Sequence, residues 1–350
     1  MRVYNLEIFS PDFVLKDHTT VGKVDFVDDF LYPEETYIPV ASGTNVATGD
    51  YVRMGDICGV VTSLENGETW GIEIRIKPFT SLLSFPMMFD TDWQGVGTLE
   101  DRIAQIITDT LISNADTEQN VTGLSVSVTS STTGWGFNLK ALTEGTHKLI
   151  INFYDTVLVR ALKEYGISVQ CAVDFSAHTI AYTIGKVSGV NTVEADLANV
   201  IRKSIAVDQR EYTINKLVMY DTDTLTDSRT YYLHPDGTFD TTDANRVTPV
   251  VFDVEAVYSD SDLDTAAASR AREVFGDSKI ENLIEIEVMR NDQMVDVENA
   301  QIGQEYVIMS GGKTYRSIVT GKKLGQTATL ILGAVRLELE KVMYRRFRNG

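Results

Sequence analysis

The last quarter of the chain, from Ile280 to Arg346, constrains the fold more than any other segment. It contains the runs IENLIEIEV and GQEYVIM, a two-glycine turn, and then YRSIVTGKKL and ATLILGAVRLELEKVMYRRF. Short runs of this composition, separated by glycine and lysine turns, are typical of antiparallel strands. The segment therefore predicts a small antiparallel β-barrel or meander. Its sequence shows no constellation of catalytic residues, which favours assembly over chemistry as its role.

The first ninety residues also predict strands, and one part of them resembles the C-terminal quarter. GDYVRM at residues 49–54 is similar to GQEYVIM at residues 303–309, with one residue inserted, and similar runs follow them, GVVTSL and SIVTGK. Two interpretations stay open: a chance similarity between β-rich segments, or two related barrels in one chain. With two barrels per chain, three subunits could build a ring of six.

Between these β-rich parts the hydrophobic period changes from two residues to that of a helix. TLEDRIAQIITDTLIS, from Thr98, places its apolar residues on one helical face, with Thr98 as the cap. A second helix is expected over residues 156–165, capped by Asp155 and stopped by Gly166. A third is expected over residues 262–275, where acidic residues begin an alanine-rich run.

Together these patterns predict a mainly β fold with an α+β insert. We expect residues 1–90, together with about 200–235, to form a first β-barrel. Residues 91–199 are expected to form a lateral α+β domain. Residues 236–350 are expected to form a second domain that contains the helix 262–275 and a C-terminal β-barrel.

The composition excludes several classes of partner. A formal net charge of −19 argues against sequence-independent binding to nucleic acid, which requires cationic side chains. It also disfavours attraction to anionic membranes. No apolar run approaches the ~18 residues of a membrane-spanning helix, so no stable membrane anchor is expected. The N-terminal residues lack a signal-peptide pattern, and Cys58 and Cys171 are expected to be unpaired buried thiols.

Motifs that could carry chemistry have simpler interpretations. GGKT at residues 311–314 lacks the glycine spacing and the following helix of a phosphate-binding loop, and is expected to be a hairpin turn. The acidic segment from Asp221 to Ser228 does not fit a calcium loop and is expected to be solvated. The four histidines have no metal-ligand spacing. We therefore expect no catalytic residue, no metal and no cofactor.

The last ten residues, KVMYRRFRNG, reverse the charge of the chain. Their cations are Lys341, Arg345, Arg346 and Arg348. They form either a frayed tail or a docking segment for an acidic surface, and this segment is also where a further domain could be attached in related chains.

From Tyr231 onward the sequence resembles the baseplate hub, or tail-tip, proteins of tailed bacteriophages, including the tail-associated lysins and prophage tail endopeptidase-like proteins. The resemblance rests on the order of YYLHPDGT, RVTPV, the alanine-rich helix, IGQEYVIMSGGKTYRSIVTGKK and LGAVRLEL. It implies two hub barrels per subunit, a homotrimeric ring around the tail channel, and an α+β domain at the side. In many relatives a C-terminal extension carries a peptidoglycan hydrolase, and this chain stops before it.

The expected function is that of a non-enzymatic structural protein of a phage or prophage tail. The resemblance implies contacts with the distal tail protein and the tail tube, and with the tape measure and receptor-binding proteins. It also implies synthesis in the bacterial cytoplasm and a final place in the virion tail. Two alternatives stay open: a cell-wall hydrolase with dispersed carboxylates, and a carbohydrate- or receptor-binding protein that uses Trp93 or Trp135.

Overall fold

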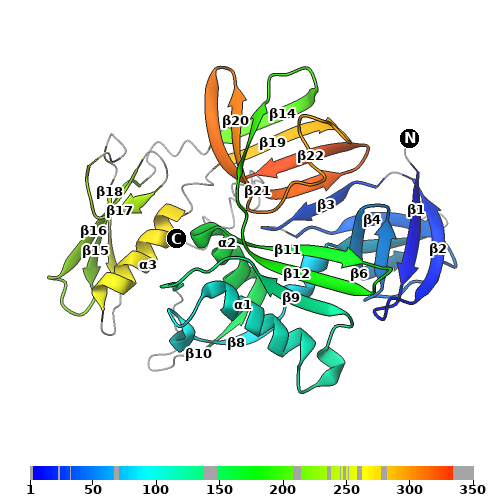
Figure 1. The fold of residues 1–350 in the computed structure, drawn as a ribbon, viewed down its shortest axis with the longest axis horizontal. Helices are drawn as coiled ribbons and strands as arrows, with labels where there is room; N and C mark the ends of the chain where they lie inside the picture. The colour runs from blue at the N-terminus through cyan, green and yellow to red at the C-terminus, as the bar shows by residue number, and fades with distance from the viewer. Residues whose placement is uncertain are drawn as a thin grey trace.

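The fold is mainly β, with two barrel-like sheets, an α+β unit beside them and a small α/β domain at the far end (Figure 1). The computed structural model describes residues 3–22, 24–31, 33–66, 71–137, 148–207, 214–234, 238–244, 246, 250, 252–257, 262–276 and 282–333. No helix in these ranges is long and apolar enough to cross a membrane.

The N-terminal sheet curls into a barrel. Its strands follow the order β2-β1-β5-β6-β7-β4, and the two edge strands of this order, β2 and β4, contact each other. Alternating side chains of β4 and β7, such as Ile38, Ile74 and Ile76, fill its interior, as the alternating sequence predicts. The strands are β1 (Tyr4–Phe9), β2 (Leu15–Val21), β4 (Thr36–Ala41), β5 (Tyr51–Met54), β6 (Ile57–Asn66) and β7 (Gly71–Lys77).

The C-terminal sheet has the order β13-β20-β21-β22-β19-β14, and β3 adds to β21. The long strand β21 joins two parts of this sheet, because its first half pairs with β20 and its second half pairs with β22 and β3. The strands are β3 (Phe26–Asp29), β13 (Val190–Glu194), β14 (Val200–Val207), β19 (Asn282–Met289), β20 (Glu305–Ser310), β21 (Lys313–Leu324) and β22 (Thr327–Leu332).

The α+β unit combines a three-stranded sheet, a two-stranded sheet and helices. β12 lies between β11 and β9, and β8 pairs with β10. Its strands are β8 (Pro86–Asp90), β9 (Leu124–Val128), β10 (Lys148–Asn152), β11 (Ile167–Asp174) and β12 (Thr179–Lys186). Its helical segments are η1 (Phe79–Leu83), η2 (Thr91–Trp93), α1 (Leu99–Ile107), η3 (Thr108–Ile112), η4 (Thr117–Gln119), η5 (Phe153–Leu158) and α2 (Val159–Tyr165).

The helix caps confirm most of the sequence predictions. The Thr98 side chain accepts a hydrogen bond from the backbone N–H of Asp101 at 3.1 Å, and Gly166 ends α2 in the left-handed conformation at φ 69°. The predicted cap at Asp155 is wrong. The helical turn begins earlier, at Phe153, and the Asn152 side chain accepts from the N–H of Asp155 at 3.1 Å.

The small domain has a separate hydrophobic core. Its strands follow the order β17-β16-β15-β18, and α3 covers one face of this sheet with Ala267, Ala271 and Phe275. Figure 1 shows α3 between this sheet and the rest of the protein. The elements are β15 (Lys216–Asp221), β16 (Ser228–Leu233), β17 (Phe239–Asp240), β18 (Phe252–Val257) and α3 (Leu263–Gly276).

Three of the predicted domain assignments are wrong because they followed chain order. Residues 200–235 do not join the N-terminal barrel: β14 pairs with β19 of the C-terminal sheet, and β15 and β16 lie in the small domain. The helix predicted at 262–275 does exist, but it packs on the small sheet and not on the C-terminal barrel. Likewise β13, predicted within the α+β domain, pairs with β20 of the C-terminal sheet.

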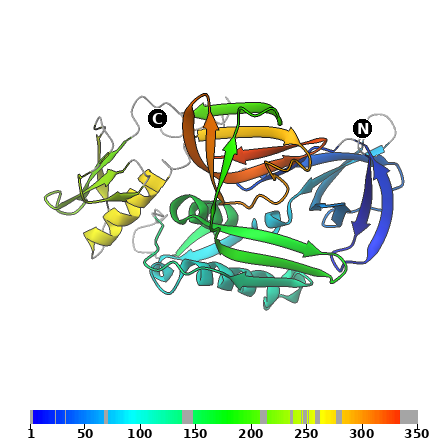
Figure 2. The ribbon, with the colours of Figure 1, turned by 45° about the horizontal axis from the view of Figure 1, so that its top comes forward.

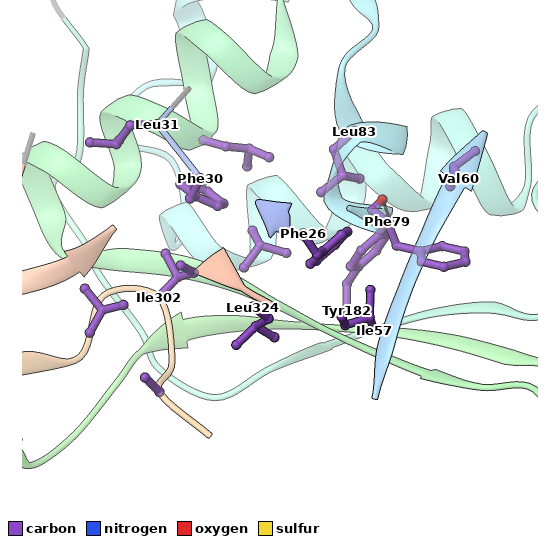
Figure 3. Packing of buried hydrophobic residues seen from close by; sticks show 14 of the residues in the cluster. Phe26, Phe30, Leu31, Ile57, Val60, Phe79, Leu83, Tyr182, Ile302 and Leu324 are labelled. Atoms are coloured by element: carbon purple, nitrogen blue, oxygen red, sulfur yellow. Dashed lines mark hydrogen bonds between the residues drawn. The ribbon is translucent and has the colours of Figure 1, made fainter. Parts of the chain in front are cut away.

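A single continuous core connects the two barrels and the α+β unit. Figure 3 shows its centre, where Phe26 and Leu324, from the strand pair β3–β21, lie close to Phe79 and Tyr182 of the α+β unit. The view in Figure 2 shows the two sheets side by side above this unit. These parts therefore form one body, to which the small domain is attached through α2 and α3.

Candidate functional site

The two barrels share a backbone pattern at corresponding positions. In the N-terminal barrel, Gly49 donates to the carbonyl of Val61 at 2.8 Å, and Val61 donates to the carbonyl of Asp50 at 2.8 Å. In the C-terminal sheet, Gly303 donates to the carbonyl of Val319 at 2.8 Å, and Val319 donates to the carbonyl of Gln304 at 2.9 Å. These are the positions at which the two sequence segments are similar.

A second shared feature follows each valine. The pairing of β6 with β7 shifts register between Val61 and Ser63, and the pairing of β21 with β22 shifts between Val319 and Gly321. The residue inserted at each bulge is a threonine. Thr62 donates to the carbonyl of Arg75 at 3.1 Å, and Thr320 donates to the carbonyl of Gly333 at 2.7 Å. Bulges re-aim a strand, so both barrels bend at the same point.

The strand order around these bulges is also the same. β5, β6 and β7 form a meander to which β4 adds, and β20, β21 and β22 form a meander to which β19 adds. The repeats differ at the next strand, since β1 runs antiparallel to β5 whereas β13 runs parallel to β20. Of the two interpretations left open by the sequence, the geometry favours two related barrels over chance similarity.

A buried arginine connects the two barrels. The side chain of Arg290, just after β19, is 3% exposed, and it donates to Asp56 and Glu298 at 2.5 Å each. It also donates to the hydroxyl of Tyr4 at 3.1 Å, and this hydroxyl donates to the carbonyl of Gly325 at 3.1 Å. Because Asp56 and Tyr4 belong to the N-terminal barrel, this cluster fixes the two barrels against each other.

A strand exchange strengthens the same junction. β3 comes from the N-terminal part of the chain but pairs antiparallel with the second half of β21. The pairing is close at Gly321, where a Cβ atom would lie 2.9 Å from the carbonyl oxygen of Asp28. Lys322 in the same stretch donates to the carbonyl of Glu298 at 2.9 Å. The relative placement of the barrels is thus set by backbone and side-chain bonds together.

A polar groove with a volume of about 530 Å³ lies on the outer face of the C-terminal sheet. Arg202 on β14 stands opposite Glu287 on β19, Glu287 stands opposite Thr329 on β22, and Thr329 stands opposite Lys323 on β21. Lys323 also pairs with Glu285 at 3.7 Å. The groove therefore carries both signs of charge in alternation across four strands.

The motifs singled out in the sequence have the simpler roles. Gly311 and Gly312 form the tight turn between β20 and β21, with φ 57° and 72°, so GGKT is a hairpin turn. Asp221 accepts from the backbone N–H of Asp223 at 2.7 Å within an exposed loop. Asp262 accepts from the N–H of Asp264 at 3.0 Å at the start of α3, which confirms its capping role.

Within the described ranges, no group of three or more His, Cys, Asp or Glu could hold a metal ion. His178 stacks on Phe13, with ring centroids 5.6 Å apart, and His234 pairs with Asp240 at 3.1 Å. Cys58 and Cys171 are unpaired, and burial raises the pKa of Cys58 to about 12. His147 and Glu281 lie outside the described residues.

The aromatic residues considered for sugar binding are largely enclosed. Trp135 is buried and contacts Phe137, while Arg102 lies over the ring of Trp93 at 5.1 Å. The four basic residues predicted to dock, Lys341, Arg345, Arg346 and Arg348, lie outside the described residues.

Arg290 and Asp56 were missed by the sequence reasoning. The sequence gives only an indirect indication that Arg290 is buried, because this arginine directly follows a strand of alternating apolar residues. Nothing near Arg290 in the sequence points to a partner in the N-terminal barrel.

No protein-family model and no curated protein matches the sequence, whereas solved structures do match the fold. The tail protein from Neisseria meningitidis MC58 matches with a TM-score of 0.56 and 10% identity, covering 95% of this chain and 96% of that one. The 43 kDa tail protein of prophage MuSo2 from Shewanella oneidensis matches with a TM-score of 0.55 and 13% identity, covering 95% and 98%. This chain therefore has the fold of phage tail proteins.

A third match has the same fold. The prophage tail protein gp18 from Listeria monocytogenes EGD-e has a TM-score of 0.50 and 11% identity, covering 98% of each chain. Since the likeness to these tail proteins spans nearly all of this chain, the small domain and the α+β unit are included in it. The expectation of a tail-protein architecture from the sequence resemblance is confirmed at the level of the fold.

Proposed function

We propose that this protein is a structural subunit of the tail of a phage or prophage-derived particle. Three copies would form a ring, to which each subunit contributes its two barrels. The ring would join the tail tube and distal tail protein to the tip or receptor-binding apparatus, with the tape measure protein as a further neighbour. It would be made in the bacterial cytoplasm and incorporated into the virion tail.

The paired bulges at Thr62 and Thr320 carry this proposal. Two barrels that bend at the same point present similar outer surfaces, and the junction at Arg290 holds them at a fixed relative angle. A rigid pair of similar units is suited to a closed ring, because head-to-tail contacts close only when each subunit contributes a constant rotation. With three subunits, six similar barrels would surround one channel.

The C-terminal sheet exposes apolar side chains where such a contact could form. Ile201 on β14, Met289 at the end of β19, and Met294 just beyond are all exposed, Met294 by 63%. The hydrogen bond of 3.0 Å from Asn199 to Asp292 brings these two segments together. Uncharged patches of this kind favour association in a chain whose net charge of −19 otherwise keeps copies apart.

The role we propose is not enzymatic. In the groove on the C-terminal sheet, Glu285 pairs with Lys323 and Glu287 accepts a hydrogen bond from the hydroxyl of Thr327. Glycoside hydrolysis needs one carboxyl kept neutral by an apolar setting, and a groove of alternating charge does not provide this setting.

The oligomeric state in solution tests the ring. We expect a native mass three times the chain's 38.9 kDa and a threefold ring with a central hole in electron micrographs. Met294→Lys should weaken this assembly. Ile150→Lys, which changes a residue that is 71% exposed on the α+β unit, should leave it intact. A monomer at tens of micromolar, or equal effects of both substitutions, would contradict the proposal.

The two alternative functions have direct tests. Clearing of peptidoglycan in a gel, lost on substitution of Glu285 or Glu287, would establish a hydrolase. Saturable binding to a glycan array, lost on substitution of Trp93, would establish a carbohydrate-binding protein. We expect neither activity.

A further inference from the structure

One face of the small domain's sheet is open. The strand register places Phe252, Lys216, Tyr232 and Asp240 in one row across the four strands, on the face opposite α3. The next row contains Val254, which is 52% exposed, whereas Phe252 is 65% exposed. This open face points away from the body of the protein, because α3 lies between the sheet and the body (Figure 1). A sheet with one apolar face uncovered is a typical docking surface.

The charge of this domain indicates what could cover the face. Residues 216–276 contain twelve Asp and Glu against five Lys and Arg, which is a net charge of −7 in 61 residues. Asp223, Asp227, Asp240 and Asp243 are all exposed. An occupant that contacts both the apolar side chains of β18 and the acidic residues of this domain should combine aromatic or aliphatic residues with cations.

The chain itself contains such a segment. Residues 341–350, KVMYRRFRNG, contain four cations and no acid, interleaved with Val342, Met343, Tyr344 and Phe347. This composition is the complement of the open face, and it differs from the rest of a chain with a net charge of −19.

The chain length allows the segment to reach the face. Gly333, the last described residue, lies against Asn282, where a Cβ at Gly333 would clash with the carbonyl oxygen of Asn282. Asn282 is six residues beyond Gly276, the end of α3, so Asn282 lies within about 22 Å of that helix end, and Gly333 is one contact farther. Tyr344 and Phe347 are eleven and fourteen residues after Gly333, so they can lie up to roughly 36–40 Å and roughly 46–50 Å from it when the chain is extended. The segment can therefore pass the edge strand β18 within the same chain.

We propose that residues 341–348 dock on the open face of the small domain of their own chain. Tyr344 and Phe347 cover Phe252 and Val254, while the cations face the acidic side chains around them. In this proposal, the acidic surface that binds the basic segment 341–348 is that of the small domain. It concerns each chain by itself and does not depend on ring formation.

Cross-linking in the full-length chain tests this contact. In the double variant Val254→Cys with Tyr344→Cys, a short bifunctional maleimide should join the two new thiols, as detected by peptide mass mapping. Because the tether is the same in both variants, only docking can make their yields differ, and we expect a yield at least about fivefold above that of Ile150→Cys with Tyr344→Cys. Ile150 is the control because it is at least as exposed as Val254 (71% against 52%) but lies on the α+β unit.

Charge reversal supplies the second arm. Arg345→Glu, Arg346→Glu and Arg348→Glu, added to the Val254→Cys and Tyr344→Cys variant, should reduce the cross-link to the yield of the control pair. The circular dichroism spectrum of the reversed variant should match that of its parent, because the proposed contact lies on the surface of the small domain. Equal yields at Val254 and Ile150, a cross-link that persists after charge reversal, or one found only between different chains would each overturn the proposal.

Discussion

Arg290 and Asp56 are 234 positions apart in the sequence, yet their side chains are joined at 2.5 Å between Nη2 and Oδ2. The pair connects the end of β19 to the turn between β5 and β6, and Glu298 binds the same guanidinium. One buried cation therefore contacts both barrels at their junction, beside the strand pair β3–β21.

Replacing Arg290 should destabilise the protein more than a comparable surface change. Arg290→Ala leaves two carboxylates without their cation, and we expect a loss of about 2–4 kcal/mol in the free energy of unfolding, below the fully buried case because the carboxylates are partly exposed. Chemical denaturation measures this loss. The control is Arg316→Ala, whose side chain is 71% exposed and pairs with Glu305, with an expected loss below about 1 kcal/mol. Equal losses would show that the junction does not depend on this cluster.

The two bulge threonines, Thr62 and Thr320, should contribute to the free energy of unfolding in proportion to their burial. Thr320 is fully buried, and Thr320→Val removes its hydrogen bond to the carbonyl of Gly333 while the volume is preserved. We expect a loss of about 1–2 kcal/mol, and a smaller one for Thr62→Val, because Thr62 is only half-buried. Thr329→Val, on the outer face of β22, should change stability by less than about 0.5 kcal/mol. A larger effect at Thr329 than at Thr320 would contradict this account of the bulge.

Glu100 should make stability depend on pH. It is buried in the first turn of α1 and accepts from Ser130 Oγ at 2.7 Å, Thr132 N at 2.7 Å and Thr132 Oγ1 at 2.9 Å. Burial alone would raise the pKa of Glu100, but these hydrogen bonds outweigh it and hold the pKa below its usual value of 4.5. The stability it contributes is therefore present above about pH 4.5 and is lost as the pH falls through the lowered pKa.

Glu100→Gln tests this dependence. At pH 7 the variant should be about 2 kcal/mol less stable than the parent, because charge-assisted hydrogen bonds are lost. The difference should shrink as the pH is lowered below 4.5, as followed by denaturant unfolding at a series of pH values. Glu118→Gln, at an exposed position, should show no such trend. A difference that does not vary with pH would disprove the role of the charge.

The two thiols should react slowly in the folded protein. Burial raises the pKa of Cys58 to about 12 and raises that of Cys171 as well, with nearby acidic charge adding to both shifts. Since only the thiolate reacts, we expect labelling at pH 8 to be at least about a hundredfold slower than in denaturant. A newly introduced Val254→Cys should react quickly in the same chain. Fast labelling of the native thiols would mean that this part of the core opens readily.

Local elements could be predicted because they depend on near neighbours. The alternation of Ile72, Ile74 and Ile76 predicts β7, the cap at Thr98 predicts α1, and the two glycines at 311 and 312 predict the hairpin. The similarity of residues 49–54 to 303–309 left chance and two related barrels as open interpretations, and the matching bulges in the structure favoured the second. The tail-protein fold was accessible through the order of the C-terminal motifs.

The sequence did not predict which strands pair with each other. The pattern of β14 does not indicate whether it joins the N-terminal sheet or β19, and nothing in residues 26–29 indicates that β3 leaves its neighbours for β21. Alternation determines which face of a strand is apolar but not which strand lies beside it. The sequence by itself therefore determined most strands and helices, because short-range sterics and periodicity decide them, and it left the repeat as one of two interpretations. Only the tertiary structure decided the pairing across the barrels, the separate small domain and the Arg290–Asp56 junction, because long-range backbone ladders and buried charges depend on where the whole chain packs.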